Sequence, residues 1–174
     1  FEFPFSVEQV VTMGRFPYLE RFKKLAQNDQ EIVDEALAWT QTIHLRDRLI
    51  SQLSSGERQR VLIARAVAQK PSILMLDEPN AHLDLKHQIE IFRLLQRINK
   101  DSSVTVVTIL HDLTATAVFF KKVALLCKGR LVKTAPPQEV ITTEILQDVY
   151  QADIEVHPSP LGGVPQVSYC ASDN

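Results

Sequence analysis

The chain has 174 residues, of which 45% are hydrophobic and 23% are charged, and its formal net charge is −2 at pH 7. This composition is typical of a globular protein with a real core. A charge balance this close to zero gives no indication of nucleic-acid binding, and the longest apolar runs are too short to span a bilayer. Any association with a membrane is therefore expected to come through a partner.

The first 70 residues are expected to form a helical arm. Ser6 and Gln9 have the spacing of a capping box at a helix start, and the segment GRFPY, residues 14–18, is expected to end that helix. A second helix is expected over residues 28–43, with acidic residues in its first turns, where the helix dipole favours them.

Residues 53–57, here called the LSSGE loop, are expected to open a third helix that runs to about Gln69. Ser54 and Glu57 predict a capping box, and Gly56 permits a close backbone approach. Free N–H groups, a hydroxyl and little bulk at a helix start are typical of an anion site. An ordinary capped helix without a ligand is the alternative.

A strand is expected from Ile73 to Glu78, buried on both faces. Its last two residues, Asp77 and Glu78, lie at the carboxyl end, where open α/β sheets place ligands, and alternation predicts that they point to opposite sides. Asp77 could hold Mg²⁺, as the strand-end aspartate of phosphate-loop NTPases does, and Glu78 could accept a proton from an attacking water. The alternative is a solvated strand end.

A turn ending in Leu83-Asp84 leads into a helix over residues 85–100. His82 and His87 are five residues apart, so they do not share a helix face and a metal site is not expected. A second buried strand, residues 103–110, ends at His111. A lone histidine is usually structural, but one that directly follows a buried strand, downstream of two acids, favours a role in the site.

The remaining residues predict a helix over 113–120, a hairpin formed by 122–127 and 130–134, and a short helix over 142–150. From Gln151 onward, proline, glycine and serine become frequent. We expect a loosely ordered tail there, with strand-like pieces at 154–156 and 164–169.

Three segments, in this order and spacing, resemble the ATP-binding subunit of ABC (ATP-binding cassette) transporters. The LSSGE loop resembles the signature motif, residues 73–78 the Walker B strand, and residues 80–84 the D-loop. Two departures are visible: Ser55 stands where glycine is usual, and Glu57 where glutamine is common. The resemblance implies an α/β fold, a partial P-loop NTPase core with a helical signature subdomain.

By this resemblance the cofactors are ATP and Mg²⁺. Asp77 would hold the metal, Glu78 would act on the attacking water, and His111 would contact the terminal phosphate. The nucleotide-binding residues implied are Ser54, Ser55, Gly56, Glu57 and Asp84. The implied division is a helical subdomain with the signature motif over residues 1–70, a RecA-like core part over 71–150 and a C-terminal tail over 151–174.

Residues 1–22 and 123–150 resemble one branch in particular, the importers of iron-siderophore, haem or cobalamin-type cargo. This implies a peripheral subunit at the cytoplasmic face of the membrane. Its expected partners are a transmembrane permease, a second ATPase subunit in a head-to-tail homodimer and, indirectly, a periplasmic or surface substrate-binding protein. Nucleic acid is not expected. Phe16, Tyr18 and Leu19 are either permease-docking residues or packing residues of the helical arm.

The sequence contains no GxxxxGK[ST] stretch, which is the Walker A loop. We therefore expect the 174 residues to be the C-terminal two-thirds of a longer subunit, inactive and aggregation-prone in isolation. Two alternatives stay open: a non-transport ABC protein, or a non-catalytic interaction module derived from the family.

Overall fold

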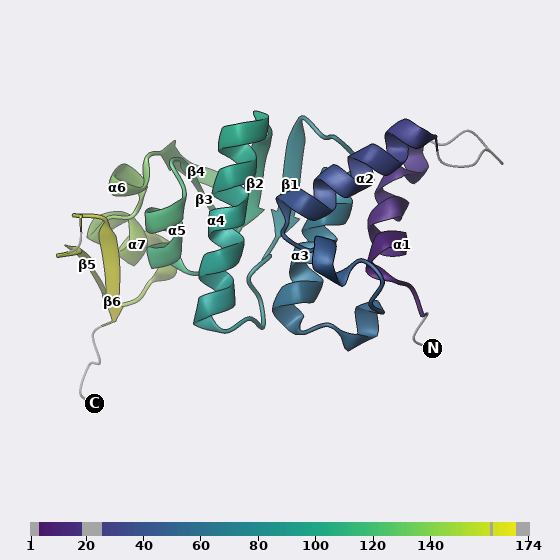
Figure 1. Cartoon of the computed structure of the whole chain (residues 1–174). Coiled ribbons are helices and arrows are strands. Elements are labelled where there is room, and N and C mark those ends of the chain that lie inside the picture. Colours follow the sequence, from purple (N-terminus) through teal and green to yellow (C-terminus); the bar gives the residue numbers. More distant parts are fainter. Residues whose placement is uncertain (1–3, 19–25, 161, 170–174) are drawn as a thin grey trace. The chain divides into compact units, whose positions relative to one another are not determined.

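The computed structural model describes residues 4–18, 26–160 and 162–169. The chain divides into two compact units, Phe1–Ile109 and Leu110–Asn174 (Figure 1). The boundary falls between Ile109 and Leu110, at the end of the second observed strand. The three-part division expected from the sequence stays a prediction.

Helices form the first part of the first unit. They are α1 (Val7–Thr12), the 3₁₀ helix η1 (Met13–Tyr18), α2 (Gln27–Trp39), the short 3₁₀ helices η2 (Ile43–Leu45) and η3 (Ile50–Gln52), and α3 (Ser55–Val67). Ser6 caps α1 in the predicted capping box. One hydrophobic cluster joins α1, α2 and α3, and its fully buried members include Val7, Val11, Val33, Leu37, Val61 and Ala64. GRFPY does not simply end the first helix, because it continues as η1.

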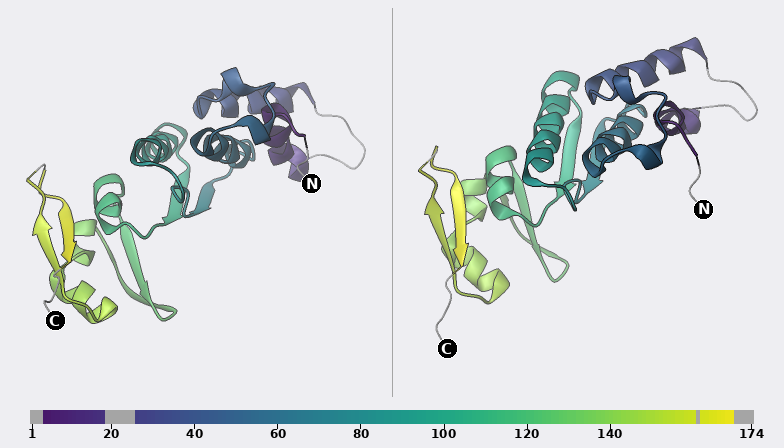
Figure 2. Two further views of the ribbon diagram at one scale, coloured as in Figure 1. Left: turned by 90° about the horizontal axis from the view of Figure 1, so that it is seen from below. Right: turned by 60° about the horizontal axis from the view of Figure 1, so that its bottom comes forward.

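Two parallel strands, β1 (Ile73–Asp77) and β2 (Thr105–Ile109), follow, connected through α4 (Leu85–Ser102). Figure 2 shows α4 along one side of this pair. Apolar side chains of α4 and Leu74 of β1 share a buried cluster, since Leu74 points to the face that α4 covers. The order strand, helix, parallel strand is a βαβ unit, as the predicted α/β fold requires.

The other face of the β1–β2 pair is exposed, so the prediction of strands buried on both faces was wrong. Met75 is 76% exposed, and Ile73, Val107 and Ile109 are also exposed. These residues alternate with those facing α4, and no described element of the first unit packs on them. Since Asp77 lies two residues beyond Met75 in the strand, its side chain belongs to this open face.

The described residues of the second unit form three helices and two hairpins. Its elements are α5 (Leu113–Phe119), β3 (Val123–Cys127), β4 (Arg130–Ala135), α6 (Pro137–Val140), α7 (Thr143–Tyr150), β5 (Ile154–Pro158) and β6 (Pro165–Tyr169). The β3–β4 turn has positive φ at Lys128 (49°) and Gly129 (75°). Two successive positive φ values match the twist of a two-residue hairpin turn, which explains the glycine.

The segment after Gln151, expected to be loosely ordered with strand-like pieces, forms a hairpin over its described residues, and the two predicted pieces are its strands. Strands β5 and β6 pair antiparallel from Ile154↔Tyr169 to Pro158↔Pro165, beside α7 (Figure 1). Ile154 is buried in the core of the second unit. The Thr143 hydroxyl accepts a bond from the Val156 amide at 3.0 Å, and the Gln147 amide donates to the Ile154 carbonyl at 3.0 Å. These side-chain bonds from α7, together with the alternation of apolar residues, hold a segment whose composition alone suggested disorder.

Candidate functional site

The LSSGE loop is a complete helix cap. The Glu57 amide donates to Ser54 Oγ at 3.3 Å, and Glu57 Oε2 accepts from both the amide and the hydroxyl of Ser54 at 2.9 Å. The hydrogen bond from the backbone amide of Ser54 lowers the pKa of Glu57 below its usual range, and the bond from the Ser54 hydroxyl adds to this effect. The predicted capping box is confirmed. Ser54 and Ser55 remain exposed, so the loop presents hydroxyls and the start of α3 to solvent.

Gly56 of this loop is buried against the start of α4. A Cβ at Gly56 would lie 2.6 Å from Cδ2 and 2.9 Å from Cγ of His87. His87 is in turn held by Asp84, the N-cap of α4. Oδ1 of Asp84 accepts from the His87 amide at 2.9 Å and lies 2.7 Å from His87 Nδ1. The bond from the His87 amide lowers the pKa of Asp84. Gly56 and Asp84, two residues predicted for the site, are thus connected through His87.

The sequence reasoning considered His87 only as a metal ligand and missed this contact. One signal was available: Asp84 and His87 have the i, i+3 spacing of an N-cap and the residue that it caps. The approach of Gly56 from a separate helix could not be read from that spacing.

The two acids at the end of β1 differ in backbone conformation. Asp77 is the last strand residue and is exposed. Glu78 is also exposed but lies beyond the strand with φ 44°, a conformation uncommon for a residue with a side chain. The predicted alternation therefore does not apply to Glu78. Its amide donates to Ile109 O at 3.2 Å, and its carbonyl accepts from the Ala81 amide at 3.0 Å, so the chain turns sharply here.

An exposed carboxylate at Asp77 suits Mg²⁺, which usually takes one or two protein carboxylates and fills its other positions with water and phosphate oxygens. In the described ranges, no group of three or more His, Cys, Asp or Glu side chains could hold a metal ion. The role of Asp77 as a metal ligand stays a prediction.

His111 lies in the second unit, two residues beyond the end of β2, and is exposed. The next residue, Asp112, caps α5 by accepting the Ala115 amide at 2.8 Å. Asp77 and Glu78 belong to the first unit. The convergence of His111 with these two acids on one nucleotide stays a prediction.

The GRFPY segment contacts the far end of α3. A Cβ at Gly14 would lie 2.2 Å from the carbonyl oxygen of Arg65, so only glycine allows η1 to approach this closely. The Tyr18 hydroxyl donates to the Gln69 carbonyl at 2.7 Å. Gln69 lies two residues beyond the last residue of α3, so this bond fixes the chain just after the helix ends.

Arg15 makes the central contact of the same segment. It is 7% exposed, pairs through Nε with Asp29 at 2.9 Å and donates through Nη1 to the Ala68 carbonyl at 2.8 Å. Its guanidinium lies 4.2 Å from the ring centre of Tyr18. Tyr18 thus has a structural role, although 58% of it is exposed. Phe16 is 56% exposed, and Leu19 lies outside the described residues, so the predicted docking role stays a prediction.

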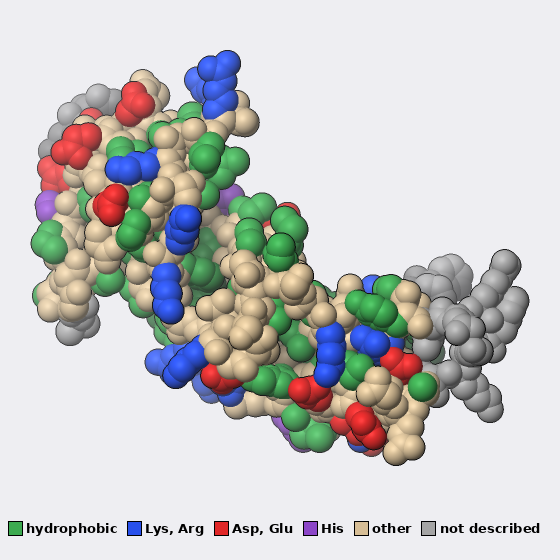
Figure 3. All heavy atoms as spheres, turned by 90° about the horizontal axis from the view of Figure 1, so that it is seen from above, with side chains coloured by type: hydrophobic (Ala, Val, Ile, Leu, Met, Phe, Trp, Pro, Cys, Tyr) green, Lys and Arg blue, Asp and Glu red, His purple; other side chains and the backbone are tan. Residues whose placement is uncertain are grey.

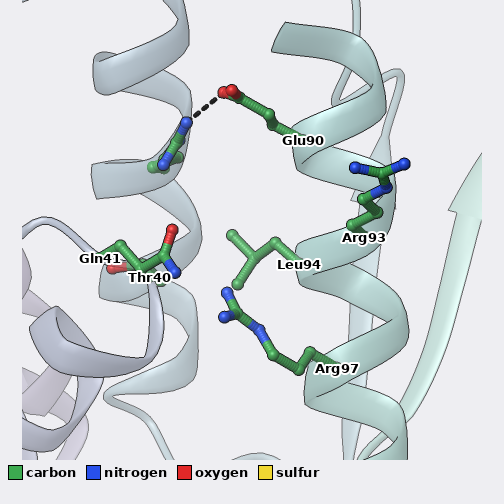
Figure 4. A pocket seen from close by; sticks show the side chains of 7 residues that line it. Thr40, Gln41, Glu90, Arg93, Leu94 and Arg97 are labelled. Carbon is green, nitrogen blue, oxygen red and sulfur yellow. Dashed lines mark hydrogen bonds and ion pairs between the residues drawn. The ribbon is translucent and has the colours of Figure 1, made fainter. Parts of the chain in front are cut away.

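Among the described residues, two pockets are lined by α3, α4 and the segment that follows α2. One, of about 220 Å³, lies at the start of both helices and is lined by Ser54, Glu57, Lys86 and His87, among others. The second, of about 290 Å³, lies further along the helices (Figure 4). Arg60 of α3 and Glu90 of α4 line both pockets. They form an ion pair across the contact between the two helices, here called the α3–α4 seam. On the face shown in Figure 3, acidic and basic side chains are interspersed over the first unit. The expectation of no nucleic-acid footprint rests on the near-neutral charge.

Comparison with known proteins decides the family. Residues 4–81, which contain the LSSGE loop and both strand-end acids, match the ABC transporter family. The chain belongs to this family of ATP-binding proteins. The ABC transporter chain is 41% identical, over 92% of its length, to the iron(3+)-hydroxamate import ATP-binding protein FhuC of Bacillus subtilis. It is 44% identical, again over 92% of its length, to the hemin import ATP-binding protein HmuV of Streptomyces coelicolor.

The chain spans 60% and 56% of the lengths of these two relatives. Among solved structures, a metal-chelate type ABC transporter in an inward-facing conformation matches 98% of this chain and 68% of its own, with a TM-score of 0.89 and 28% identity. The dimeric bacterial ABC transporter cassette MJ0796 matches 76% of this chain and 57% of its own, with a TM-score of 0.62 and 27% identity. The fold class predicted from the sequence is confirmed. No helix in the described part of the chain is long and apolar enough to cross a membrane.

Proposed function

We propose that these residues are part of the ATP-hydrolysing subunit of an importer for iron-siderophore, haem or cobalamin-type cargo. The observation that carries the proposal is that the first compact unit combines a capped LSSGE loop with a βαβ unit whose first strand ends at Asp77 and Glu78. The import names of the relatives support the cargo class.

Within this site, Asp77 holds Mg²⁺, which neutralises charge on the phosphates when bound. Glu78 orients the attacking water and accepts its proton. His111 donates a hydrogen bond to the terminal phosphate. Ser54, Ser55, Gly56 and Glu57 offer a hydroxyl-rich helix start to the phosphates of a nucleotide held mainly by a second copy, and Asp84 borders the same contact.

The proposed assembly is a head-to-tail pair of such subunits bound to a transmembrane permease at the cytoplasmic face of the membrane. A substrate-binding protein acts indirectly through that permease. The dimeric cassette among the structural neighbours supports the pairing. ATP stabilises the closed pair because each half-site alone leaves the triphosphate charge only partly neutralised.

We further propose that a preparation of only these 174 residues has negligible affinity for ATP and negligible turnover, since they contain no backbone cradle or lysine of the GxxxxGK[ST] type. Titration with a fluorescent ATP analogue tests this. Micromolar affinity for the 174-residue chain would overturn it.

The function itself is tested by a chimera. The 174 residues replace the matching region of FhuC, whose own remaining part supplies the rest of the subunit. We expect ATP hydrolysis by the purified chimera and growth of an fhuC-deleted strain on iron(3+)-hydroxamate. A Glu78→Gln chimera should fold and bind ATP but hydrolyse it roughly 10²–10⁴-fold more slowly. A folded chimera that binds ATP with hydrolysis unaffected by Glu78→Gln would refute the assignment.

A further inference from the structure

The start of α3 and the start of α4 meet at His87. The ring of His87 occupies the space that a side chain at residue 56 would need, with 2.6 Å between its Cδ2 and an added Cβ. Real Cβ atoms essentially never approach so closely. Glycine is thus required at position 56 by the histidine ring rather than by a left-handed backbone.

The ring is held in one orientation from the other side. Asp84 Oδ1 accepts from the His87 amide at 2.9 Å and lies 2.7 Å from Nδ1. An ionised carboxylate can only accept, so Nδ1 carries the proton and donates. The His87 side chain is 33% exposed. The backbone amide and the ring of this residue both contact the same carboxylate.

Further contacts continue this seam away from the LSSGE loop. Arg60 of α3 pairs with Glu90 of α4, one helical turn beyond Gly56 and His87. The Gln88 side-chain amide donates to the Leu83 carbonyl at 2.9 Å and attaches α4 to the turn before it. His87 is therefore the contact nearest to the loop, and the Arg60–Glu90 pair is a natural comparison for it.

We propose that His87 is a positioning residue. Anchored by Asp84, its ring sets the position of the LSSGE backbone at Gly56, so that the loop and the turn ending at Asp84 keep one fixed arrangement. The consequence for catalysis rests on the proposed function: two segments that border the same nucleotide are held as one body and approach it together. The positioning itself does not depend on ATP.

Amide hydrogen exchange of the 174-residue chain tests the positioning. The reporters are the amides of Glu57 and Arg58, which donate to Ser54 Oγ and to the Ser54 carbonyl. His87→Leu fills the space but cannot donate, and we expect exchange at both amides to rise roughly fivefold to tenfold, in the range for the loss of one ordinary hydrogen bond. His87→Asn keeps a donor near Nδ1 and a flat group against Gly56, and should restore the slow exchange.

Glu90→Gln is the matched control, because it weakens the neighbouring ion pair and leaves His87 in place. It should change exchange at Glu57 and Arg58 by less than about twofold, as expected for a partly exposed pair. The proposal is overturned if His87→Leu exchanges like the unmodified chain, if His87→Asn is no slower than His87→Leu, or if Glu90→Gln has as large an effect as His87→Leu.

A double substitution supplies an independent test. Gly56→Ala should raise exchange at the two reporters by at least about fivefold, because its Cβ collides with the ring. In a His87→Ala background the ring is gone and the nearest remaining atom is Cβ of His87 at 3.3 Å, so most of this effect should disappear. Additive effects of the two substitutions would contradict the proposal.

Activity separates this inference from the proposed function. In the FhuC chimera, His87→Leu should lower the turnover rate and His87→Asn should restore it. If the chimera hydrolyses ATP but the exchange results fail, only the positioning role is refuted. If the exchange results hold and no chimera hydrolyses ATP, only the function is refuted.

Discussion

The start of α3 is held by hydrogen bonds between Ser54 and Glu57, which are three positions apart. Its end is held by hydrogen bonds from the side chains of Arg15 and Tyr18 to carbonyl groups 53 and 51 positions later in the sequence. The first end is partly exposed and carries the proposed nucleotide contact. The second end is held by the buried Arg15–Asp29 pair. The buried anchor of α3 therefore lies at the end opposite its proposed nucleotide contact, and we expect changes in the LSSGE loop to cost less stability than changes at that anchor.

The strongest test of this comparison is Arg15→Ala. It leaves the Asp29 carboxylate, 13% exposed, without its guanidinium and removes the donor to the Ala68 carbonyl. Breaking a buried pair in this way should cost about 3–5 kcal/mol in the free energy of unfolding, measured by urea denaturation. A loss below about 1 kcal/mol would show that the far end of α3 is not anchored by this pair.

The next largest effect is expected for Gly14→Ala. Alanine favours helices over glycine, so on propensity alone it should stabilise η1. The added Cβ, however, would lie 2.2 Å from the Arg65 carbonyl oxygen. We expect a net loss of about 1–3 kcal/mol in the free energy of unfolding, from overpacking. Ala68→Gly, which removes the neighbouring methyl group without relieving the backbone contact, should not restore the loss.

At the other end, Ser54→Ala removes a cap and should cost about 1 kcal/mol in the free energy of unfolding. Ser54→Gly should lower the free energy of unfolding by only roughly a few tenths of a kcal/mol, because glycine is a tolerated N-cap residue. Both are measured by thermal or urea unfolding against the unmodified chain. A loss from Ser54→Ala as large as that from Arg15→Ala would remove the distinction between the two ends.

The smallest effect is expected from pH. Hydrogen bonds from the amide and hydroxyl of Ser54 lower the pKa of Glu57 in the folded state. The ionised carboxylate therefore makes its full contribution to stability at pH values above the ordinary pKa of a glutamate, about 4.3. The contribution is lost as the pH falls through the lowered folded-state value. Exchange at the Ser54 amide, corrected for intrinsic rates, should accelerate over that interval. In Glu57→Gln it should not, and an identical profile in both chains would contradict the assignment.

Much of the fold followed from local patterns. Ser54 and Glu57 predicted the cap because their contact spans three residues and needs no other element. The two apolar runs predicted β1 and β2, and the motif spacing led to the confirmed ABC family. Two of the predictions that failed did so for clear physical reasons. Strands β1 and β2 have one exposed face because burial depends on what packs there, and the described residues between 154 and 169 form a hairpin because α7 supplies partners that composition does not reveal.

The sequence by itself therefore determined the elements, the family and the residue types offered to a nucleotide, because periodicity and short spacings express themselves within a few residues. Only the tertiary structure decided which side chains contact carbonyl groups, carboxylates or rings that lie far away in the sequence. Arg15 contacts Ala68, and His87 contacts Gly56, because separate helices pack against each other in one particular arrangement. Such contacts depend on the packing of separate elements, which spacing along the chain does not encode.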